Sequence, residues 1–149
     1  MRETIAQALK NALKAQEKLR ISTLRLVNAA IQDRDISNRG AGKDPVSDDD
    51  ILQILAKMVK QREESAKAFE DGGRPELAAQ EREEIGIIRE YLPKQMDDDA
   101  VKQAVADAIA ETGAEGLRDM GRVMNLLKER FTGQMDFGKA GGIVKASLQ

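Results

Sequence analysis

Residues 118–149, RDMGRVMNLLKERFTGQMDFGKAGGIVKASLQ, carry the clearest fold signal in the chain. Apolar residues recur at helical spacing on both sides of a turn that contains Gly133, which predicts two short amphipathic helices. Six cations stand against three anions, so the stretch carries a charge of +3 within a chain of net charge −2. The sequence therefore predicts that a helix pair forms the most basic region of a slightly acidic protein.

The composition of the whole chain also favours helices. Of its 149 residues, 41% are hydrophobic but only 3% are aromatic, and three prolines leave long stretches uninterrupted. β-Branched and aromatic residues never gather into the alternating runs that are typical of strands. We therefore predict an all-α fold.

Several classes of function are disfavoured by the residues that the chain lacks. It contains no cysteine and no histidine, which excludes Ser-His-Asp and Cys-His catalysis, and we expect neither a metal site nor a cofactor. No stretch approaches 18 apolar residues, and MRETIAQALK lacks the apolar core of a signal peptide. We expect a soluble, cytoplasmic protein without membrane association. A pI of about 5.4 means that any nucleic-acid contact must come from a local basic patch.

The N-terminal 92 residues are predicted to form four helices. The first covers residues 2–15, the second ends near Ile36, and residues 37–45 have the glycine, asparagine and proline of a mobile loop. The inner faces that we expect are given by Ile5, Leu9, Ala12 and Leu13, then by Leu24, Val27 and Ile31.

The third predicted helix has a strong start signal. Ser47 can cap it, Asp50 sits three residues on, and Val46 and Ile51 have the spacing of a hydrophobic staple. Glycines 72 and 73 should end it, and a fourth helix should run from Pro75 to Pro93.

Two sets of charged residues on these two helices receive a structural interpretation. The acidic run at residues 81–84 is interpreted as a solvated face. Charges on the third helix are expected to form pairs within that helix; they are Lys60, Arg62, Glu63, Glu64 and Lys67.

A second group of helices is predicted after Pro93. Asp97 can cap a helix that Gly113 ends, and the two helices of the basic stretch follow. We place Val101, Val105, Ala108 and Ile109, then Leu117, Met120, Met124, Leu127 and Phe131, then Ala140, Ile143, Val144 and Leu148 on their inner faces. We predict two domains: a four-helix bundle over residues 1–92 and a three-helix bundle over residues 97–149.

A series of motifs resembles the YqeY family over essentially the whole chain. It comprises Leu24-Arg25, Ala29-Ala30-Ile31, residues 60–65, Gly73-Arg74, Leu77-Ala78, Glu81, Glu84 and Tyr91-Leu92-Pro93. The later pattern of residues 119–124, Gly133, Asp136 and residues 143–145 is similar to a motif that YqeY proteins share with the tail of GatB. GatB is a subunit of the glutamine-dependent amidotransferase that corrects misacylated tRNA. The resemblance implies a four-helix and a three-helix bundle.

The same resemblance implies contact with tRNA or docking to a partner, because the amidotransferase chemistry lies in other parts of that complex. This chain departs from the family pattern at two places. Gln134 stands where a basic residue is frequent after the turn glycine, and Gly141 and Gly142 interrupt the final helix. Both departures weaken the expectation of tRNA contact.

The candidate tRNA-binding residues are cations of the basic stretch that could neutralise phosphates; they are Arg122, Lys128, Arg130, Lys139 and Lys145. The alternative interpretation is an ordinary solvated surface. A second basic set comprises Lys10, Lys14, Lys18, Arg20 and Arg25. Residues 133–139 match the spacing GxxxxGK, but Ala140 replaces the magnesium-binding Ser or Thr and a helix precedes the motif, so we interpret it as a helix–turn–helix linker.

Three functions follow from these observations. The first is a non-catalytic helical module that contacts tRNA or the aminoacylation machinery. The second is a protein–protein interaction adaptor that uses the third and fourth helices. The third is a component of a carbon–nitrogen ligase with glutamine as amido-N-donor, although we identify no catalytic residues because no nucleophile and base stand together.

Overall fold

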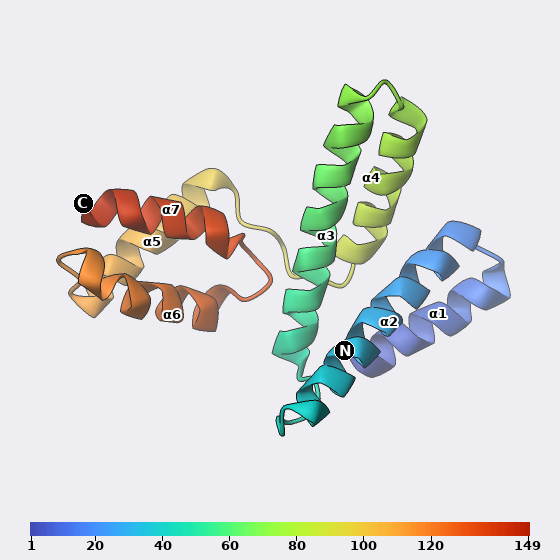
Figure 1. Cartoon of the computed structure of the whole chain (residues 1–149), viewed down its shortest axis with the longest axis horizontal. Coiled ribbons are helices and arrows are strands. Elements are labelled where there is room, and N and C mark those ends of the chain that lie inside the picture. The colour runs from blue at the N-terminus through green and yellow to red at the C-terminus, as the bar shows by residue number, and fades with distance from the viewer. The chain divides into compact units, whose positions relative to one another are not determined.

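A computed structural model describes all 149 residues of the chain, which form helices joined by turns and loops, without any strand. The predicted all-α class is thereby confirmed. Seven α-helices and one short 3-10 helix follow one another (Figure 1): α1 (Arg2–Ala15), α2 (Lys18–Gly40), α3 (Asp48–Asp71), α4 (Pro75–Arg89), α5 (Asp98–Thr112), η1 (Leu117–Asp119), α6 (Met120–Phe131) and α7 (Phe137–Leu148).

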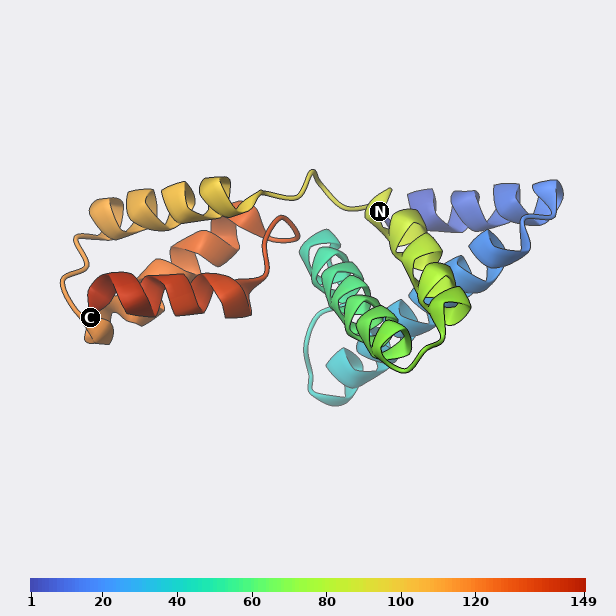
Figure 2. The ribbon, with the colours of Figure 1, turned by 90° about the horizontal axis from the view of Figure 1, so that it is seen from above.

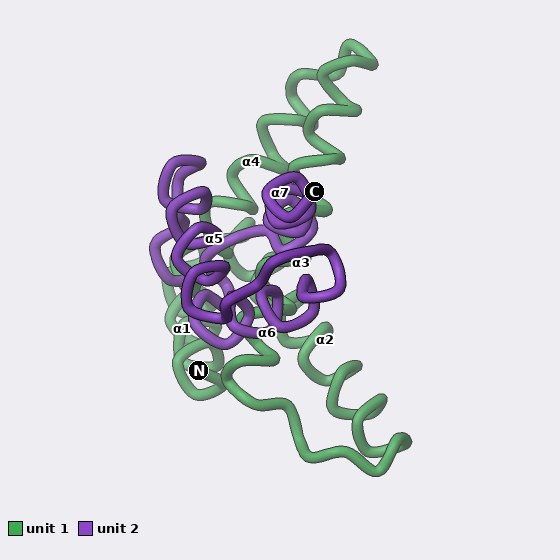
Figure 3. The backbone as a smooth tube through the Cα atoms, turned by 90° about the vertical axis from the view of Figure 1, so that its left-hand side faces the viewer, with its two compact units in different colours: residues 1–92 green, residues 93–149 purple.

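The chain divides into two compact units, Met1–Leu92 and Pro93–Gln149, which Figure 3 draws in green and purple. The first unit contains α1 to α4, and the second contains α5, η1, α6 and α7. The predicted assignment of two bundles as separate domains, over residues 1–92 and 97–149, stays a prediction.

Helices α1 and α2 are joined by a two-residue link and lie side by side (Figures 1 and 2). Gln16 adopts the left-handed conformation with φ 57°, and its N–H donates to the carbonyls of the last turn of α1. Ile5 and Ala12 are buried as predicted, but Leu13 is 44% exposed. The prediction for Leu13 was wrong because α1 packs chiefly on one neighbour, α2, which covers only a narrow stripe.

Helix α2 continues to Gly40, four residues beyond the end predicted at Ile36. Its extension is stabilised by Asn38, which is buried and donates from Nδ2 to the carbonyl of Asp44 at 3.2 Å. The carbonyl of Asn38 accepts from the N–H of Lys43 at 2.7 Å. These bonds connect the helix end to the following segment, so the first residues of the predicted loop are helical.

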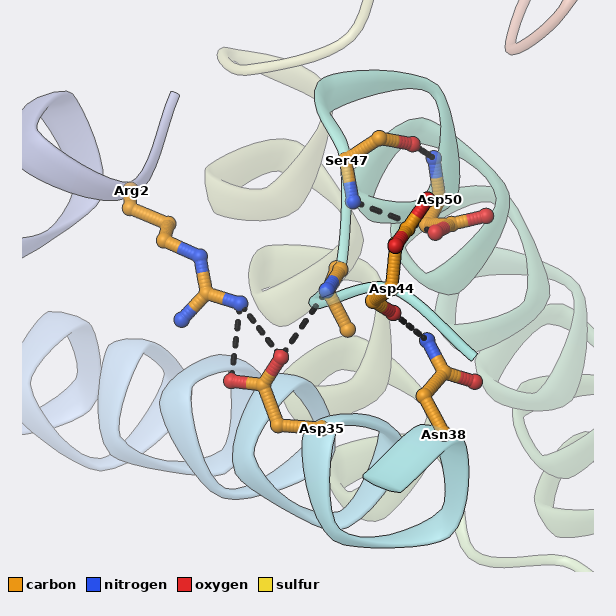
Figure 4. A network of polar contacts seen from close by, with 7 residues as sticks. Arg2, Asp35, Asn38, Asp44, Ser47 and Asp50 are labelled. Atoms are coloured by element: carbon orange, nitrogen blue, oxygen red, sulfur yellow. Dashed lines mark hydrogen bonds and ion pairs between the residues drawn. The ribbon is translucent and has the colours of Figure 1, made fainter. Parts of the chain in front are cut away.

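Asp35 connects three parts of the first unit (Figure 4). Its carboxylate accepts two hydrogen bonds from Arg2 Nη2, at 2.6 and 2.7 Å, and one from the N–H of Val46 at 2.9 Å. The side-chain hydrogen bond from Arg2, followed by the backbone bond from Val46, lowers the pKa of Asp35 below its usual value. The start of α1, the last third of α2 and the segment before α3 are thereby held together.

The start of α3 has the capping box that the sequence predicts. Ser47 Oγ accepts from the N–H of Asp50, and Asp50 accepts from the N–H of Ser47, both at 3.1 Å. Val46 and Ile51 are both buried, as the staple requires. Helix α3 ends before Gly72, and Pro75 opens α4, which lies alongside α3 in Figures 1 and 2.

Ion pairs cross from α3 to α4, which corrects two predictions. Arg62 pairs with Glu84 at 3.1 Å, and both side chains are only 13% exposed. Arg89 pairs with Glu63 at 2.6 Å, and Arg82 pairs with Glu70. Glu84 therefore does not belong to a solvated face. Arg62 and Glu63 pair across the helix interface because α4 offers partners that the sequence of α3 cannot reveal.

The second unit begins with an ordered connection. Asp97 accepts from the N–H of Ala100 at 2.7 Å and caps α5 as predicted, and Gly113 ends this helix with φ 66°. Before the cap, Gln95 Nε2 donates to the carbonyl of Gly133 at 2.6 Å, and Met96 N–H donates to that of Gln134 at 2.9 Å. The turn between α6 and α7 is thus tied to the start of the unit.

The packed face of α6 differs from the prediction. Val123 and Leu127 are fully buried, whereas Met120 and Met124 are only partly buried against the core. Leu117 is 47% exposed and lies in η1, outside α6. Placing the large, apolar Met120 and Met124 on the inner face shifts the predicted stripe away from Val123. The prediction thus missed Val123 and wrongly included Leu117. Ala140, Val144 and Leu148 of α7 are buried as predicted.

Candidate nucleic-acid interface

The five candidate cations all lie on the two helices of the basic stretch. Arg122, Lys128 and Arg130 are on α6, while Lys139 and Lys145 are on α7. Burial of the apolar face of each helix leaves these five side chains exposed. The structure therefore places every candidate on the surface of the second unit, where a phosphate can reach it.

Three of the five cations already have acidic partners. Arg122 pairs with Asp119 at 2.8 Å and also donates to the carbonyl of Thr112 at 3.2 Å. Arg130 makes a bidentate contact with Glu111, in which Nη1 donates to Oε2 and Nη2 lies 3.0 Å from Oε1. The remaining pair joins Lys139 and Asp98 at 3.0 Å. The sequence could not reveal the last two pairs, because their members are 19 and 41 residues apart.

These pairs lower the pKa values of their three acidic members below the usual values. The hydrogen bond from Arg130 lowers the pKa of Glu111, and the bond from Lys139 lowers that of Asp98. For Asp119 the largest cause is the N–H of Glu115, followed by Arg122, and its pKa is also lowered. All three acids therefore remain ionised at neutral pH and neutralise part of the basic surface.

Lys128 and Lys145 differ from the other three candidates because neither has an ion-pair partner. Lys128 lies in the last turn of α6 and Lys145 in the last turn of α7. A cation in this position interacts favourably with the partial negative charge at a helix C-terminus. These two lysines are the candidates that no acidic side chain neutralises.

The second basic set lies on α1 and α2 of the first unit. Arg20 pairs with Glu17 at 3.1 Å and with Glu90 at 2.7 Å, and the hydrogen bond to Glu90 raises its pKa. The other four members are exposed and have no ion-pair partner; they are Lys10, Lys14, Lys18 and Arg25. This set is consequently less neutralised than the candidate set.

The segment with GxxxxGK spacing forms a turn followed by a helix. Asp136 caps α7 by accepting from the N–H of Gly138 at 2.9 Å, so this N–H already has a carboxylate partner. Lys139 pairs with Asp98, and Ala140 is fully buried. The arrangement agrees with a helix–turn–helix linker and differs from a phosphate loop, which presents its N–H groups and lysine to the nucleotide.

Two further observations concern metal binding and membrane crossing. No group of three or more acidic side chains is placed to hold a metal ion. None of the seven helices combines the length and the apolar character that crossing a membrane requires.

Comparison with known families adds to this geometry. The model of the YqeY family, described as Yqey-like protein, matches residues 2–148. The chain belongs to the YqeY family. The resemblance predicted from the ordered motifs is thereby confirmed, whereas the similarity of the last third to the GatB tail stays a prediction.

Three proteins to which the chain is similar come from fungi. The chain is 26% identical over 112 residues to "Altered inheritance of mitochondria protein 41, mitochondrial" of Saccharomyces cerevisiae, covering 72% of this chain but only 59% of that protein. The protein of the same name from Pyrenophora tritici-repentis is 25% identical over 133 residues, which cover 82% and 68% of the two chains. An uncharacterized protein of Schizosaccharomyces pombe is 28% identical over 95 residues, which cover 63% and 73%.

The names of two relatives place those proteins in mitochondria. The cytoplasmic location predicted for this chain stays a prediction.

Proposed function

We propose that this YqeY-family chain is a non-catalytic module whose C-terminal unit contacts tRNA phosphates. The observation that carries the proposal is the pair of exposed, unpaired lysines Lys128 and Lys145 on helices whose stretch has a net charge of +3. Cations of this kind neutralise phosphates and release counterions. The similarity to the GatB tail that the sequence predicts for the pattern between residues 119 and 145 supports tRNA as the ligand.

Two of the paired cations would join the contact by exchanging partners. Arg130 and Lys139 hold their acids in exposed pairs, and such pairs contribute only about 0–1 kcal/mol. A phosphate could replace the carboxylate at small cost, and the planar guanidinium of an arginine can bind it through two parallel bonds. Lys128 and Lys145 would give the first attraction, and the paired cations would strengthen the contact.

Structured RNA fits this surface better than single-stranded RNA. Proteins that bind single strands stack bases on exposed aromatic side chains. Phe131 and Phe137 are the aromatic residues of the second unit, and both pack against its core. Recognition by shape and phosphate position, as in double-stranded or elbow-shaped RNA, therefore suits the unit.

Fluorescence anisotropy tests the proposal with unfractionated tRNA and a duplex RNA of similar length. The chain should bind tRNA more tightly than the duplex near physiological salt. The double variant Lys128→Glu/Lys145→Glu should lose at least tenfold in tRNA affinity. Lys94→Glu/Lys102→Glu makes the same charge change within the same unit but outside α6 and α7, and it should bind within about threefold of the unaltered chain.

Two results would remove the proposal. Equal weakening by both double variants would reduce the interaction to net charge alone. Release of ammonia from glutamine by the purified chain would contradict the non-catalytic assignment and favour the ligase alternative.

A second candidate function is a protein–protein adaptor. The observation that favours it is the exposure of large aliphatic side chains that lie close together on the first unit, at Leu13 and Leu26. They lie on α1 and α2 rather than on the third and fourth helices, where the sequence predicted the partner surface. Recovery of the same protein partner before and after nuclease treatment would support this function, and loss of that partner with nuclease would oppose it.

A further inference from the structure

The chain exposes few large hydrophobic side chains, and two of them line the same groove. Leu13 of α1 is 44% exposed and Leu26 of α2 is 49% exposed, while Ile21, beside them, is partly buried. The groove is open, has a volume of about 590 Å³, and is lined by Leu13, Lys18, Ile21, Ser22, Arg25 and Leu26. Half of its lining residues are thus large and aliphatic.

The helical repeat of α2 explains how these residues come together. Lys18, Ser22 and Arg25 are separated by four and three residues, so they follow one face of the helix. Ile21 and Leu26 border that face. The short link after α1 brings Leu13 onto the first turns of α2, and it is the residue that the sequence wrongly predicted to be internal. The groove is therefore formed by the α1–α2 pair.

The charged residues that line the groove are all positive. Lys18 and Arg25 line it without an ion-pair partner, and no acidic residue belongs to its lining. Lys18 also borders a second groove that Glu76 and Glu83 line, so part of its field is offset there. Arg25 is consequently the main available cation beside the exposed leucines.

We propose that this groove binds an amphipathic helix of a partner protein, with aliphatic residues on one face and acidic residues beside them. This inference rests on the adaptor function and names its site and partner. Aliphatic anchors at i, i+3 and i+7 would cover Leu13, Ile21 and Leu26, as in other helix-in-groove complexes. Aspartates or glutamates flanking those anchors would meet Arg25 and Lys18, which gives orientation and selectivity.

RNA is a poorer occupant than a helix. The lining contains no aromatic residue on which a base could stack. Desolvating Leu13 and Leu26 favours an apolar partner surface, which the edge of an RNA duplex does not offer. The aliphatic side chains of Leu13, Ile21 and Leu26 and the cation Arg25 together favour an acidic amphipathic helix.

A designed peptide tests the groove on the full chain. The probe is a labelled helical peptide with leucines at i, i+3, i+4 and i+7 and glutamates beside them, and its partner probe carries lysines in place of the glutamates. Anisotropy should show binding of the acidic peptide at least tenfold tighter than of the basic one. Leu26→Glu should reduce the affinity for the acidic peptide at least tenfold.

Two further variants make the test specific. Ile36→Glu introduces the same charge on the same helix, at a residue that is 65% exposed and outside the groove, and it should leave peptide binding within about twofold. Arg25→Glu should weaken the acidic peptide and strengthen the basic one. Equal loss in Leu26→Glu and Ile36→Glu would overturn the proposal.

Other outcomes separate the groove from the adaptor function. Binding to phosphatidylserine vesicles that Leu26→Glu abolishes, without binding of either peptide, would overturn the proposal in favour of a lipid surface. A nuclease-resistant partner that Leu26→Glu recovers as well as the unaltered chain would overturn the groove and leave the adaptor function standing. Selective binding of the acidic peptide without any nuclease-resistant partner would support the groove and oppose the adaptor function.

Discussion

Helices α3 and α4 use charged residues differently from α6 and α7. Between α3 and α4, ion pairs cross the interface, and the Arg62–Glu84 pair is 13% exposed on both sides. In α6 and α7 the packed faces are apolar, around Val123, Leu127 and Val144, and the cations point outward to acids of α5 and η1 or have no partner.

The difference shows that similar runs of charged residues can have different structural roles. Charges spaced three or four residues apart look alike in the sequence of α3 and of α6. In α3 they become part of a helix interface because α4 supplies Glu84 and Arg89 opposite Arg62 and Glu63. In α6 the packed face is apolar, Arg122 and Arg130 pair at the surface with Asp119 and Glu111, and Lys128 has no ion-pair partner.

The largest expected change in stability is at Leu127, in the apolar core beneath α6. Because Leu127 is fully buried, Leu127→Ala leaves a cavity and should lower the free energy of unfolding by about 3 kcal/mol. Urea denaturation followed by circular dichroism measures this loss. Leu117→Ala is the matched control, and its exposed side chain should cost only about 0.5 kcal/mol. Similar losses for both leucines would contradict the observed packing of α6.

A smaller loss of stability is expected at Arg62, in the charged interface between α3 and α4. Arg62→Ala leaves Glu84 without its partner in a mostly buried place, which should lower the free energy of unfolding by about 2 kcal/mol. Arg89→Ala removes an exposed pair with Glu63 and should cost about 0.5 kcal/mol or less in the same urea experiment.

A double variant separates the pair from the packing around it. Arg62→Met/Glu84→Leu removes both charges and keeps apolar volume, so it should regain at least half of the stability that Arg62→Ala loses. A double variant as unstable as Arg62→Ala would show that packing, rather than an unpaired charge, causes the loss.

The smallest expected effect is a pH dependence at Glu81. Burial, followed by the charge of Glu84, raises the pKa of Glu81 in the folded chain above its usual value. The folded state therefore binds this proton more tightly than the unfolded state, and stability is lost as the pH rises through the folded pKa. Glu81→Gln should raise the free energy of unfolding at pH 7 by about 0.5 kcal/mol.

That gain should shrink on acidification, because protonated glutamic acid and glutamine are both neutral. Urea denaturation at pH 7 and at about pH 3.5, below the usual pKa of a glutamic acid, measures the difference. A gain that stays the same at both pH values would contradict the assigned cause.

Local signals in the sequence predicted much of the fold. Ser47 and Asp97 cap α3 and α5 as predicted because a capping side chain bonds to an N–H only three residues away. Gly113 ends α5 for an equally local reason, since its left-handed φ is accessible to glycine. The family followed from motifs in order along the whole chain.

Features that depend on distant residues could not be predicted in the same way. Helix α2 extends to Gly40 because Asn38 bonds to Asp44, which lies beyond the helix. Likewise, Glu111 and Asp98 neutralise Arg130 and Lys139 from another helix. Charge counting in residues 118–149 therefore identified a basic stretch but not which cations are available.

The salt dependence of tRNA binding tests the central claim most directly, namely that Lys128 and Lys145 contact phosphates. We expect the logarithm of the affinity to fall linearly with the logarithm of the salt concentration. In Lys128→Glu/Lys145→Glu the slope should become shallower by between about 1.4 and 1.8, which corresponds to two lost phosphate contacts. The free energy of unfolding should change by about 0.5 kcal/mol or less. A slope and affinity equal to those of the unaltered chain would contradict the claim.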